Sequence, residues 1–283
     1  MRHINIEDIE YRLKQAVIQC GHELPEDVLS ALNKAYDRET QSRAKNILSQ
    51  VITNAQIAKE KRIPLCQDTG LAVIFIKQGS KTQIMPEGIN LFAVVNQAVK
   101  DGYEEGFLRK SVVEEPLNQR KNTQTNTPCV IHYEQTEGDG FEISVMLKGG
   151  GCENKSQFKM FNPTENVANI SNWIVNVVKD AGANACPPFV VGVGIGGDFE
   201  QCCFLAKKSL LREIGSHNSD KFYEEIEQSL LAKINSTGLG AMGLGGNTTA
   251  LAVMVETAAC HIASLPVAVN IECHSHRHKT ITF

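Results

Sequence analysis

Apolar residues change their spacing near residue 62, and this change decides the fold class. Up to that point they recur every three or four positions in three segments, which begin near Ile6, Val28 and Glu39, as amphipathic helices require. Afterwards, short β-favouring apolar runs alternate with glycine-rich turns and further helical segments. We therefore expect an α+β protein, with a mostly helical part at 1–62 packed on a mixed sheet with helices at 63–283.

The second part supplies the predicted strands. Residues 71–76 form an apolar run typical of a buried strand. Residues 129–135 and 141–147 alternate apolar and polar side chains on either side of a glycine-containing turn, which predicts a β-hairpin. Further strands are expected at 189–197, 251–255 and 267–271. The stretch 122–128 is too hydrophilic and unpatterned for the core, and no repeat or linker divides the chain, so residues 1–283 are interpreted as one domain.

Composition and charge exclude several classes of protein. Apolar residues make up 42% and charged residues 21%, enough for a full core, and the formal net charge is −4. Without a strongly basic face, nucleic acid and anionic membranes are poor partners. The most apolar stretch, 249–269, is interrupted by Glu256, His261 and Pro266, and the first residues are acidic, so neither a membrane span nor a signal peptide is expected. We expect a soluble, cytoplasmic protein.

The nine cysteines include no C-x-x-C pair. An odd number of cysteines in a long chain without an export signal argues against a disulfide framework. The missing pairs exclude zinc ribbons, thioredoxin-like motifs and ferredoxin-type cluster loops. Any metal site must therefore join cysteines that are distant in the sequence. Most of the thiols, including the adjacent Cys202 and Cys203, are interpreted as packing residues.

Glycines form three patterns. G-x-G-x-x-G occurs at 192–197 and at 238–243, but the first lacks an acidic residue at the end of a second strand, and the second follows a helix, so neither meets the requirements of a dinucleotide site. Tight turns and close backbone packing explain both patterns better. Gly149-Gly-Gly151 follows a predicted strand, where it suits either a flexible turn or a backbone nest that binds an anion.

Histidines and a proline-flanked cysteine are further candidates. His274, His276 and His278 alternate, so a strand would place them on one face that could hold zinc, whereas a solvated polar segment is the simpler interpretation. His261 lies between apolar stretches and is interpreted as a buried core histidine unless it has a catalytic role. Two prolines fix the backbone after Cys186, which suits a metal ligand or a structural turn.

Five motifs occur in a recognisable order: Cys-Gln-Asp-Thr-Gly at 66–70, Gly-Gly-Gly-Cys-Glu-Asn at 149–154, Cys-Pro-Pro at 186–188, the glycine-rich loop at 238–246 and Cys-His-Ser-His-Arg at 273–277. Over residues 10–283 the chain resembles the iron–sulfur (class I) fumarate hydratases and the related L-tartrate dehydratases. It resembles the α subunit of their two-subunit form, because single-chain relatives continue beyond the last of these motifs.

The resemblance implies a 4Fe–4S cluster held by Cys66, Cys186 and Cys273, one cysteine from each of three motifs. Three thiolates for four irons would leave one iron open to act as a Lewis acid toward a substrate hydroxyl. The activity implied is the reversible hydration of fumarate to (S)-malate, and the alternative is the dehydration of L-tartrate to oxaloacetate. Segments 243–251 and 261–267 look more like those of the fumarate hydratases.

The same resemblance gives roles to five further residues. Asp68 and His261 would be catalytic, and Gln67 would contact substrate beside the cluster. Arg109 would hold a substrate carboxylate in a charge-assisted pair, although by itself it would be interpreted as an exposed surface charge. Gly150 would lend a backbone contact from the triple-glycine loop.

Relatives carry further active-site groups in a C-terminal part that is absent from this sequence. The resemblance therefore implies a β subunit, a dicarboxylate substrate and either an α2β2 assembly or a homodimer of α chains, and the chain alone is not expected to turn over. The sequence departs from the family at Gln124, where relatives carry Gly, and at Cys152, where they often carry Ser, so Cys152 is not expected to be a ligand. A zinc-dependent hydrolase and a non-catalytic regulatory or scaffold chain are the rival interpretations.

Overall fold

Three helices occupy most of the first sixty residues, as the apolar spacing predicts: α1 (Ile6–His22), α2 (Glu26–Arg38) and α3 (Ser42–Lys61). The side chain of Asn5 caps α1 by accepting a hydrogen bond from the Glu7 N–H group. In α3 the buried stripe continues from Ala55 to Ala58, while Ile57 is 41% exposed, because residues three apart share a helix face and neighbours do not.

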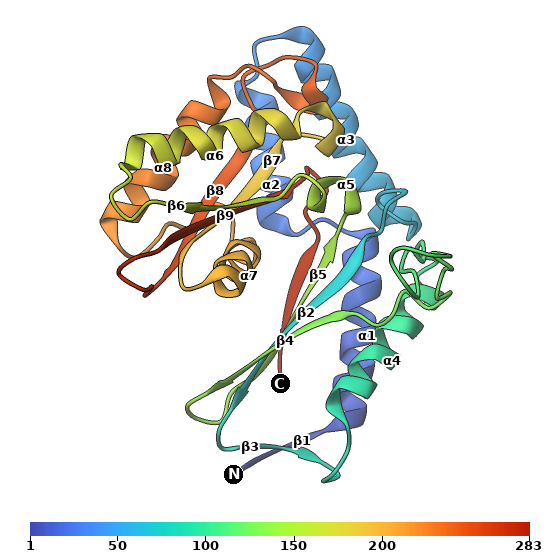
Figure 1. The fold of residues 1–283 in the computed structure, drawn as a ribbon. Helices are drawn as coiled ribbons and strands as arrows, with labels where there is room; N and C mark the ends of the chain where they lie inside the picture. Colours follow the sequence, from blue (N-terminus) through green and yellow to red (C-terminus); the bar gives the residue numbers. More distant parts are fainter. The chain divides into compact units, whose positions relative to one another are not determined.

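The computed structural model describes residues 1–283 as two compact units. Unit 1 comprises Met1–Pro25, Asn54–Gly149 and Arg277–Phe283, and unit 2 comprises Glu26–Thr53 and Gly150–His276. Each unit has its own four-stranded mixed sheet with helices packed on it (Figure 1), so the predicted α+β class is confirmed. The expected single sheet is two sheets, because each unit builds a separate apolar core. The interpretation of 1–283 as one domain stays a prediction.

Unit 1 is built on a sheet with the strand order β10-β5-β2-β4. Its strands are β2 (Leu71–Gly79), β4 (Val130–Thr136), β5 (Phe141–Lys148) and β10 (His278–Thr282). The short strands β1 (Arg2–Asn5) and β3 (Thr82–Met85) form a separate parallel pair. Helices α1 and α4 (Leu91–Glu105) lie side by side (Figure 1) and bury their apolar faces against β2 and β5.

The predicted hairpin at 129–147 is wrong. Its two strands form, but β4 is parallel to β2 and β5 is antiparallel to β2, so β2 lies between them. Residues 72–76 of β2 are all buried, so this strand needs a hydrogen-bonding partner along both of its edges. The turn at 137–140 therefore passes the end of β2, where the Gly79 N–H group donates to the Gly140 carbonyl oxygen.

Unit 2 is built on a sheet with the order β6-β9-β7-β8. Its strands are β6 (Gln157–Phe161), β7 (Phe189–Gly196), β8 (Ala250–Ala258) and β9 (Leu265–Glu272). Helices α6 (Val167–Ala181) and α8 (Lys221–Asn235) lie on one face, and α7 (Phe199–Ser209) lies on the other (Figure 1). The remaining elements are short: α5 (Gly150–Glu153) and the 3-10 helices η1 (Ala183–Ala185) and η2 (Ala241–Gly243).

Strand β7 explains the first glycine pattern. Its valines, Val191 and Val193, belong to the core that α6 and α8 cover, while Gly192 and Gly194 face α7. A Cβ atom at Gly194 would lie only 2.1 Å from the Cys202 carbonyl oxygen of α7. The interpretation of this pattern as close backbone packing is therefore confirmed.

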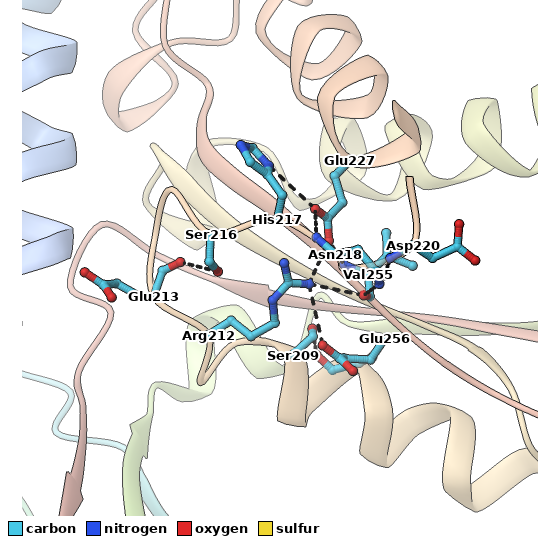
Figure 2. Close-up of polar contacts among 11 residues, drawn as sticks. Ser209, Arg212, Glu213, Ser216, His217, Asn218, Asp220, Glu227, Val255 and Glu256 are labelled. Carbon is cyan, nitrogen blue, oxygen red and sulfur yellow. Dashed lines mark hydrogen bonds and ion pairs between the residues drawn. The ribbon is translucent and has the colours of Figure 1, made fainter. Parts of the chain in front are cut away.

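An ion pair between the half-buried Arg212 and the buried Glu227 fixes the segment that follows α7, and Figure 2 shows its polar contacts. Arg212 Nη1 donates to Glu227 Oε1 of α8 at 2.7 Å and to the Val255 carbonyl oxygen of β8 at 3.2 Å. Glu227 also accepts from the N–H groups of Val255 at 2.8 Å and Asn218 at 3.0 Å. The charge of Glu227 is thus balanced and hydrogen-bonded inside unit 2, as a buried carboxylate requires.

None of the helices combines the length and the apolar character that crossing a bilayer requires.

Candidate functional site

Four of the predicted site residues lie in unit 1: Cys66, Gln67, Asp68 and Arg109. The first three belong to an irregular loop between α3 and β2, and Arg109 follows α4. Thr69 Oγ1 donates to the Arg109 carbonyl oxygen at 2.9 Å, which joins the two segments. Gln67 and Arg109 are exposed, and Cys66 and Asp68 are half-buried. Unit 1 therefore carries one thiol, one carboxyl and one amide on a single loop, and it joins the backbone of Arg109 to the same loop.

Tyr103 and Asn126 hold the end of this loop. Tyr103 Oη donates to the carbonyl oxygens of the last two loop residues, at 2.9 and 2.8 Å, and burial raises the pKa of its hydroxyl, which keeps it a donor. Asn126 is fully buried, donates from Nδ2 to the Gly70 carbonyl oxygen at 3.1 Å and accepts from the Ser111 N–H group at 2.6 Å. The expectation that 122–128 lies outside the core is wrong at Asn126, because its amide satisfies buried backbone groups.

Two further contacts fix Asp68. Its carboxylate accepts from the Gly70 N–H group at 3.0 Å, and its carbonyl oxygen accepts from Arg277 Nη2 at 2.9 Å. Arg277 is 1% exposed, and its Nε and Nη1 groups have no hydrogen-bond partner. A buried guanidinium with unfilled donors is costly unless an anion or a water reaches it. Arg277 is the last residue of the 273–277 motif, but no role for it was expected from the sequence.

The other two predicted ligands lie in unit 2. Cys186 follows η1 in a left-handed conformation, with φ 56° and ψ 64°, and Cys273 follows β9. The His274 N–H group donates to the Cys186 carbonyl oxygen at 3.3 Å, and His274 Nδ1 lies 3.0 Å from the same oxygen. Strands β7 and β9 are antiparallel, with Val190 opposite Glu272. The start of β7 and the end of β9 therefore lie next to each other at one end of the sheet. Unit 2 thereby brings Cys186 and Cys273 together.

Cys152, which is not expected to be a ligand from the sequence, lies at the same end of the sheet. Its thiol lies on α5, 3.7 Å from the Ala185 carbonyl oxygen. The sulfur atoms of Cys152 and Cys273 and a carboxylate oxygen of Glu272 all lie within 4.8 Å of one another, and all three residues are buried. Gly150, the predicted backbone contact, begins α5 and is exposed. No spacing rule could have found this group, because its members come from two distant segments.

His261 lies at the opposite end of the same sheet. It is exposed in the loop between β8 and β9, at the end where Gly196 pairs with Ala258. Cys186 and Cys273 lie at the other end of β7, eight residues and roughly 25 Å away. The interpretation of His261 as a buried core histidine is wrong, because the loop carries it out of the sheet. Within one chain, His261 is not brought to Cys273.

The three C-terminal histidines do not share a strand face. His274 and His276 lie in the turn after β9, and only His278 belongs to β10. His276 is fully buried, with Nε2 2.8 Å from the Leu210 carbonyl oxygen. The alternation predicted one face, but the chain leaves one sheet and enters another between these residues. The strand face that could have held zinc is therefore not formed, and the simpler interpretation of a solvated polar segment is wrong too, because His276 and Arg277 are buried.

Two comparisons with known proteins decide the family. The family model described as fumarate hydratase (Fumerase) matches residues 10–282. The chain belongs to the fumarate hydratase family. A Methanocaldococcus jannaschii protein provisionally named L(+)-tartrate dehydratase subunit alpha is 43% identical over 258 residues, which cover 90% of each chain. L(+)-tartrate dehydratase alpha subunits from Escherichia coli (strain UTI89) and Shigella sonnei are 35% and 34% identical over 260 residues, covering 91% of this chain and 85% of theirs.

Membership of the fumarate hydratase family confirms the resemblance inferred from the five motifs and makes the chain a hydro-lyase. The family implies an iron–sulfur cluster. The donors of unit 2 fit such a group, because Cys186 and Cys273 place two soft sulfur ligands at one end of the sheet. Cys66 belongs to unit 1, so a ligand set of three cysteines stays a prediction. The relatives are named as alpha subunits.

Proposed function

We propose that the chain is the α subunit of a fumarate hydratase, which adds water to fumarate to give (S)-malate and removes it in the reverse direction. Cys66, Cys186 and Cys273 are the proposed ligands of a 4Fe–4S cluster. Two observations carry the proposal: Cys186 and Cys273 lie close together at one end of the unit 2 sheet, and the family model matches the chain. When bound, such a cluster would supply a Lewis-acidic iron without a protein ligand.

In this proposal the loop of unit 1 moves the proton. Asp68 exchanges a proton with the substrate carbon that lies next to a carboxylate. Its backbone is held by Arg277 and its carboxylate by the Gly70 N–H group, so its orientation is set before substrate binds. The two unfilled donors of the buried Arg277 guanidinium favour negative charge near this loop, as binding of a dianion requires.

Exposed groups of both units bind substrate in this proposal: Arg109 and Gln67 of unit 1 and Gly150 of unit 2. Arg109 pairs with one substrate carboxylate, since a guanidinium can donate two parallel hydrogen bonds to it. Gln67 offers an amide beside Asp68, and Gly150 offers a backbone N–H group from α5. These neutral donors would stabilise the charge that develops on the substrate without themselves changing protonation state.

His261 requires a second copy of the chain. Roughly 25 Å separates His261 from the end of its own sheet at which Cys186 and Cys273 lie. His261 can therefore act at a cluster held by these cysteines only from a neighbouring α chain. The proposed assembly therefore contains at least two α chains, as an α2β2 arrangement would, together with the β subunits that supply the remaining groups.

Dehydration of L-tartrate to oxaloacetate is a second candidate, which the names of the relatives favour. Both reactions take a four-carbon 2-hydroxydicarboxylate and remove water across the central carbon–carbon bond. The substrates differ by one hydroxyl group. A site that hydrogen-bonds this hydroxyl would discriminate strongly against the substrate that lacks it.

The test is a substrate comparison on the complete enzyme. The chain is produced with its β subunit, loaded anaerobically with iron and sulfide, and assayed for kcat/KM with fumarate, (S)-malate and L-tartrate. We expect turnover of fumarate and (S)-malate, whereas a preference for L-tartrate would select the second candidate. Arg109→Lys should lower kcat/KM by roughly tenfold to a hundredfold, the loss of a charged hydrogen bond, while the exposed Arg120→Lys should leave it unchanged. Turnover of neither substrate class would contradict both candidates.

A further inference from the structure

We propose that Cys152, Glu272 and Cys273 form a binding site for one thiophilic divalent cation, such as Zn2+. Two thiols and one carboxylate oxygen within 4.8 Å of one another, all buried, are the observation that carries this proposal. Two of the three residues, Cys152 and Glu272, have no part in the proposed cluster. The site is thus distinct in composition from the cluster ligand set, although it shares Cys273 with it.

The spacing of these donors is fixed by the packing of α5 and the segment after it on β9. Asn270 Nδ2 donates to Glu153 Oε2 at 3.1 Å, and the Ile271 N–H group donates to Ser156 Oγ at 3.2 Å. These contacts lie directly beside Cys152 on one side and directly before Glu272 on the other. Donors placed by regular elements and their hydrogen bonds are pre-organised, so little further ordering is needed when an ion binds.

The donor chemistry selects the class of ion. Sulfur and carboxylate ligands bind Zn2+ at about 2.3 and 2.0 Å, so two ligands of a tetrahedral ion lie about 3.5–3.8 Å apart. Small side-chain rotations would bring the three donors from within 4.8 Å to that separation. Mg2+ and Ca2+ take oxygen ligands and are disfavoured by two thiols. Three protein ligands leave the fourth position of such an ion to water.

His276 lies beside the carboxylate. Its Nδ1 atom is 3.7 Å from Glu272 Oε2, too far for a hydrogen bond, and its Nε2 atom lies 2.8 Å from the Leu210 carbonyl oxygen of the backbone that follows α7. A ring held there would be available to orient the carboxylate once an ion is bound, as second-layer partners of metal ligands do.

Sharing Cys273 has a consequence that rests on the proposed function. Zn2+ held by the Cys273 sulfur would compete with the cluster iron for that ligand, so Zn2+ bound at this site should oppose cluster assembly. A cluster-free chain would then hold a metal ion where two buried thiols would otherwise lie side by side.

The experiment uses the cluster-free full chain, prepared anaerobically, with Co2+ as a spectroscopic probe and Zn2+ as its competitor. We expect one Co2+ per chain, with the charge-transfer absorption of thiolate ligands, and its displacement by one Zn2+. Cys152→Ser should weaken Zn2+ binding at least about tenfold and roughly halve the charge-transfer intensity, because one of two thiolates is lost. Glu272→Gln should weaken binding while keeping that intensity for each bound Co2+.

Cys202→Ser is the matched control, since Cys202 is equally buried but lies on α7, where its thiol contacts the Gly194 carbonyl oxygen. It should bind Co2+ and Zn2+ as the unsubstituted chain does. Absence of a thiolate band in the unsubstituted chain, or an unchanged affinity in both Cys152→Ser and Glu272→Gln, would overturn the proposal. Circular dichroism checks the fold of each variant, and Glu272→Gln keeps the side-chain shape if Cys152→Ser unfolds.

A reconstitution arm separates this inference from the proposed function. The chain is treated with iron and sulfide with and without equimolar Zn2+, and the brown absorption of the cluster is followed. Cluster formation without any specific Zn2+ binding would defeat the inference alone. Specific Zn2+ binding without cluster formation would defeat the proposed cofactor alone.

Discussion

At the scale of single residues, burial separates the nine thiols into different chemical roles. Cys20 and Cys202 are buried in apolar cores, and desolvation raises the pKa of each thiol to about 12, while that of Cys129 rises to about 11. Such thiols stay neutral and act as packing residues. Cys66 and Cys186 are only half-buried and lie on irregular backbone. The nine cysteines are chemically identical in the sequence, and only their surroundings in the structure distinguish them.

These pKa shifts predict that stability falls as the pH rises above about 9. The thiols of Cys20 and Cys202 ionise near 9.0 when unfolded but keep their protons to about 12 when folded. Between these values the unfolded state holds fewer protons, so raising the pH favours it, by at most about 1.4 kcal/mol per pH unit for each thiol. Urea unfolding from pH 8 to pH 10.5 measures the slope. Cys20→Ala should reduce it, whereas alanine at the exposed Cys260 should not. An identical slope in Cys20→Ala would show that the Cys20 thiol is not protected.

At the scale of elements, β7 shows how one strand serves two neighbours of different size. Its valines fill the core below α6 and α8, and its glycines let α7 approach the backbone on the other face. Since side chains alternate along a strand, every second position of β7 can be specialised for one neighbour. The same logic explains β2, whose apolar side chains are buried on both faces of the strand and whose edges are paired by β4 and β5.

Gly194→Ala is predicted to destabilise unit 2 strongly. A Cβ atom there would lie 2.1 Å from the Cys202 carbonyl oxygen and 2.7 Å from the Ala206 nitrogen, both backbone atoms of α7 that cannot rotate away. Overpacking of this kind costs about 3 kcal/mol or more. Gly140→Ala is the matched control, because nothing lies within 4 Å of its Cβ position. Urea unfolding should show a much lower midpoint for Gly194→Ala, and equal midpoints would refute the packing argument.

At the scale of the whole molecule, the site residues divide between the two units. Unit 1 carries Asp68 and Arg109 with Cys66, while unit 2 carries Cys186 and Cys273. Neither unit holds all of the proposed cluster ligands by itself. The relatives are named as alpha subunits, and the proposed function assigns the remaining groups of the site to a β subunit.

The isolated chain is therefore predicted to be inactive even when it is loaded with its cluster. Without the groups of a β subunit, charge developing on the substrate lacks part of its stabilisation, and each missing donor costs about a hundredfold or more in kcat. Hydration of fumarate, followed by the loss of its ultraviolet absorption, should appear when the β subunit is added. A comparable rate from the α chain alone would contradict this division of the site.

The class of most elements and the family could be predicted from local sequence patterns alone. Periodic apolar residues report which side of a helix or strand is buried, so α1, α2, β2 and β9 were predictable from local spacing. The order of five motifs identified the family because each motif preserves local chemistry. Neither signal contains the path of the chain between elements.

Which segments meet became visible only in the folded chain. The fold placed β2 between β4 and β5, brought Asn126 and Arg277 to the Asp68 loop, set Cys152 beside Cys273 and left His261 at the far end of the sheet. These arrangements depend on pairing along sheet edges and on packing between segments far apart in the sequence. A hydrophobic pattern encodes which face of an element is buried, and it does not encode which partner buries it.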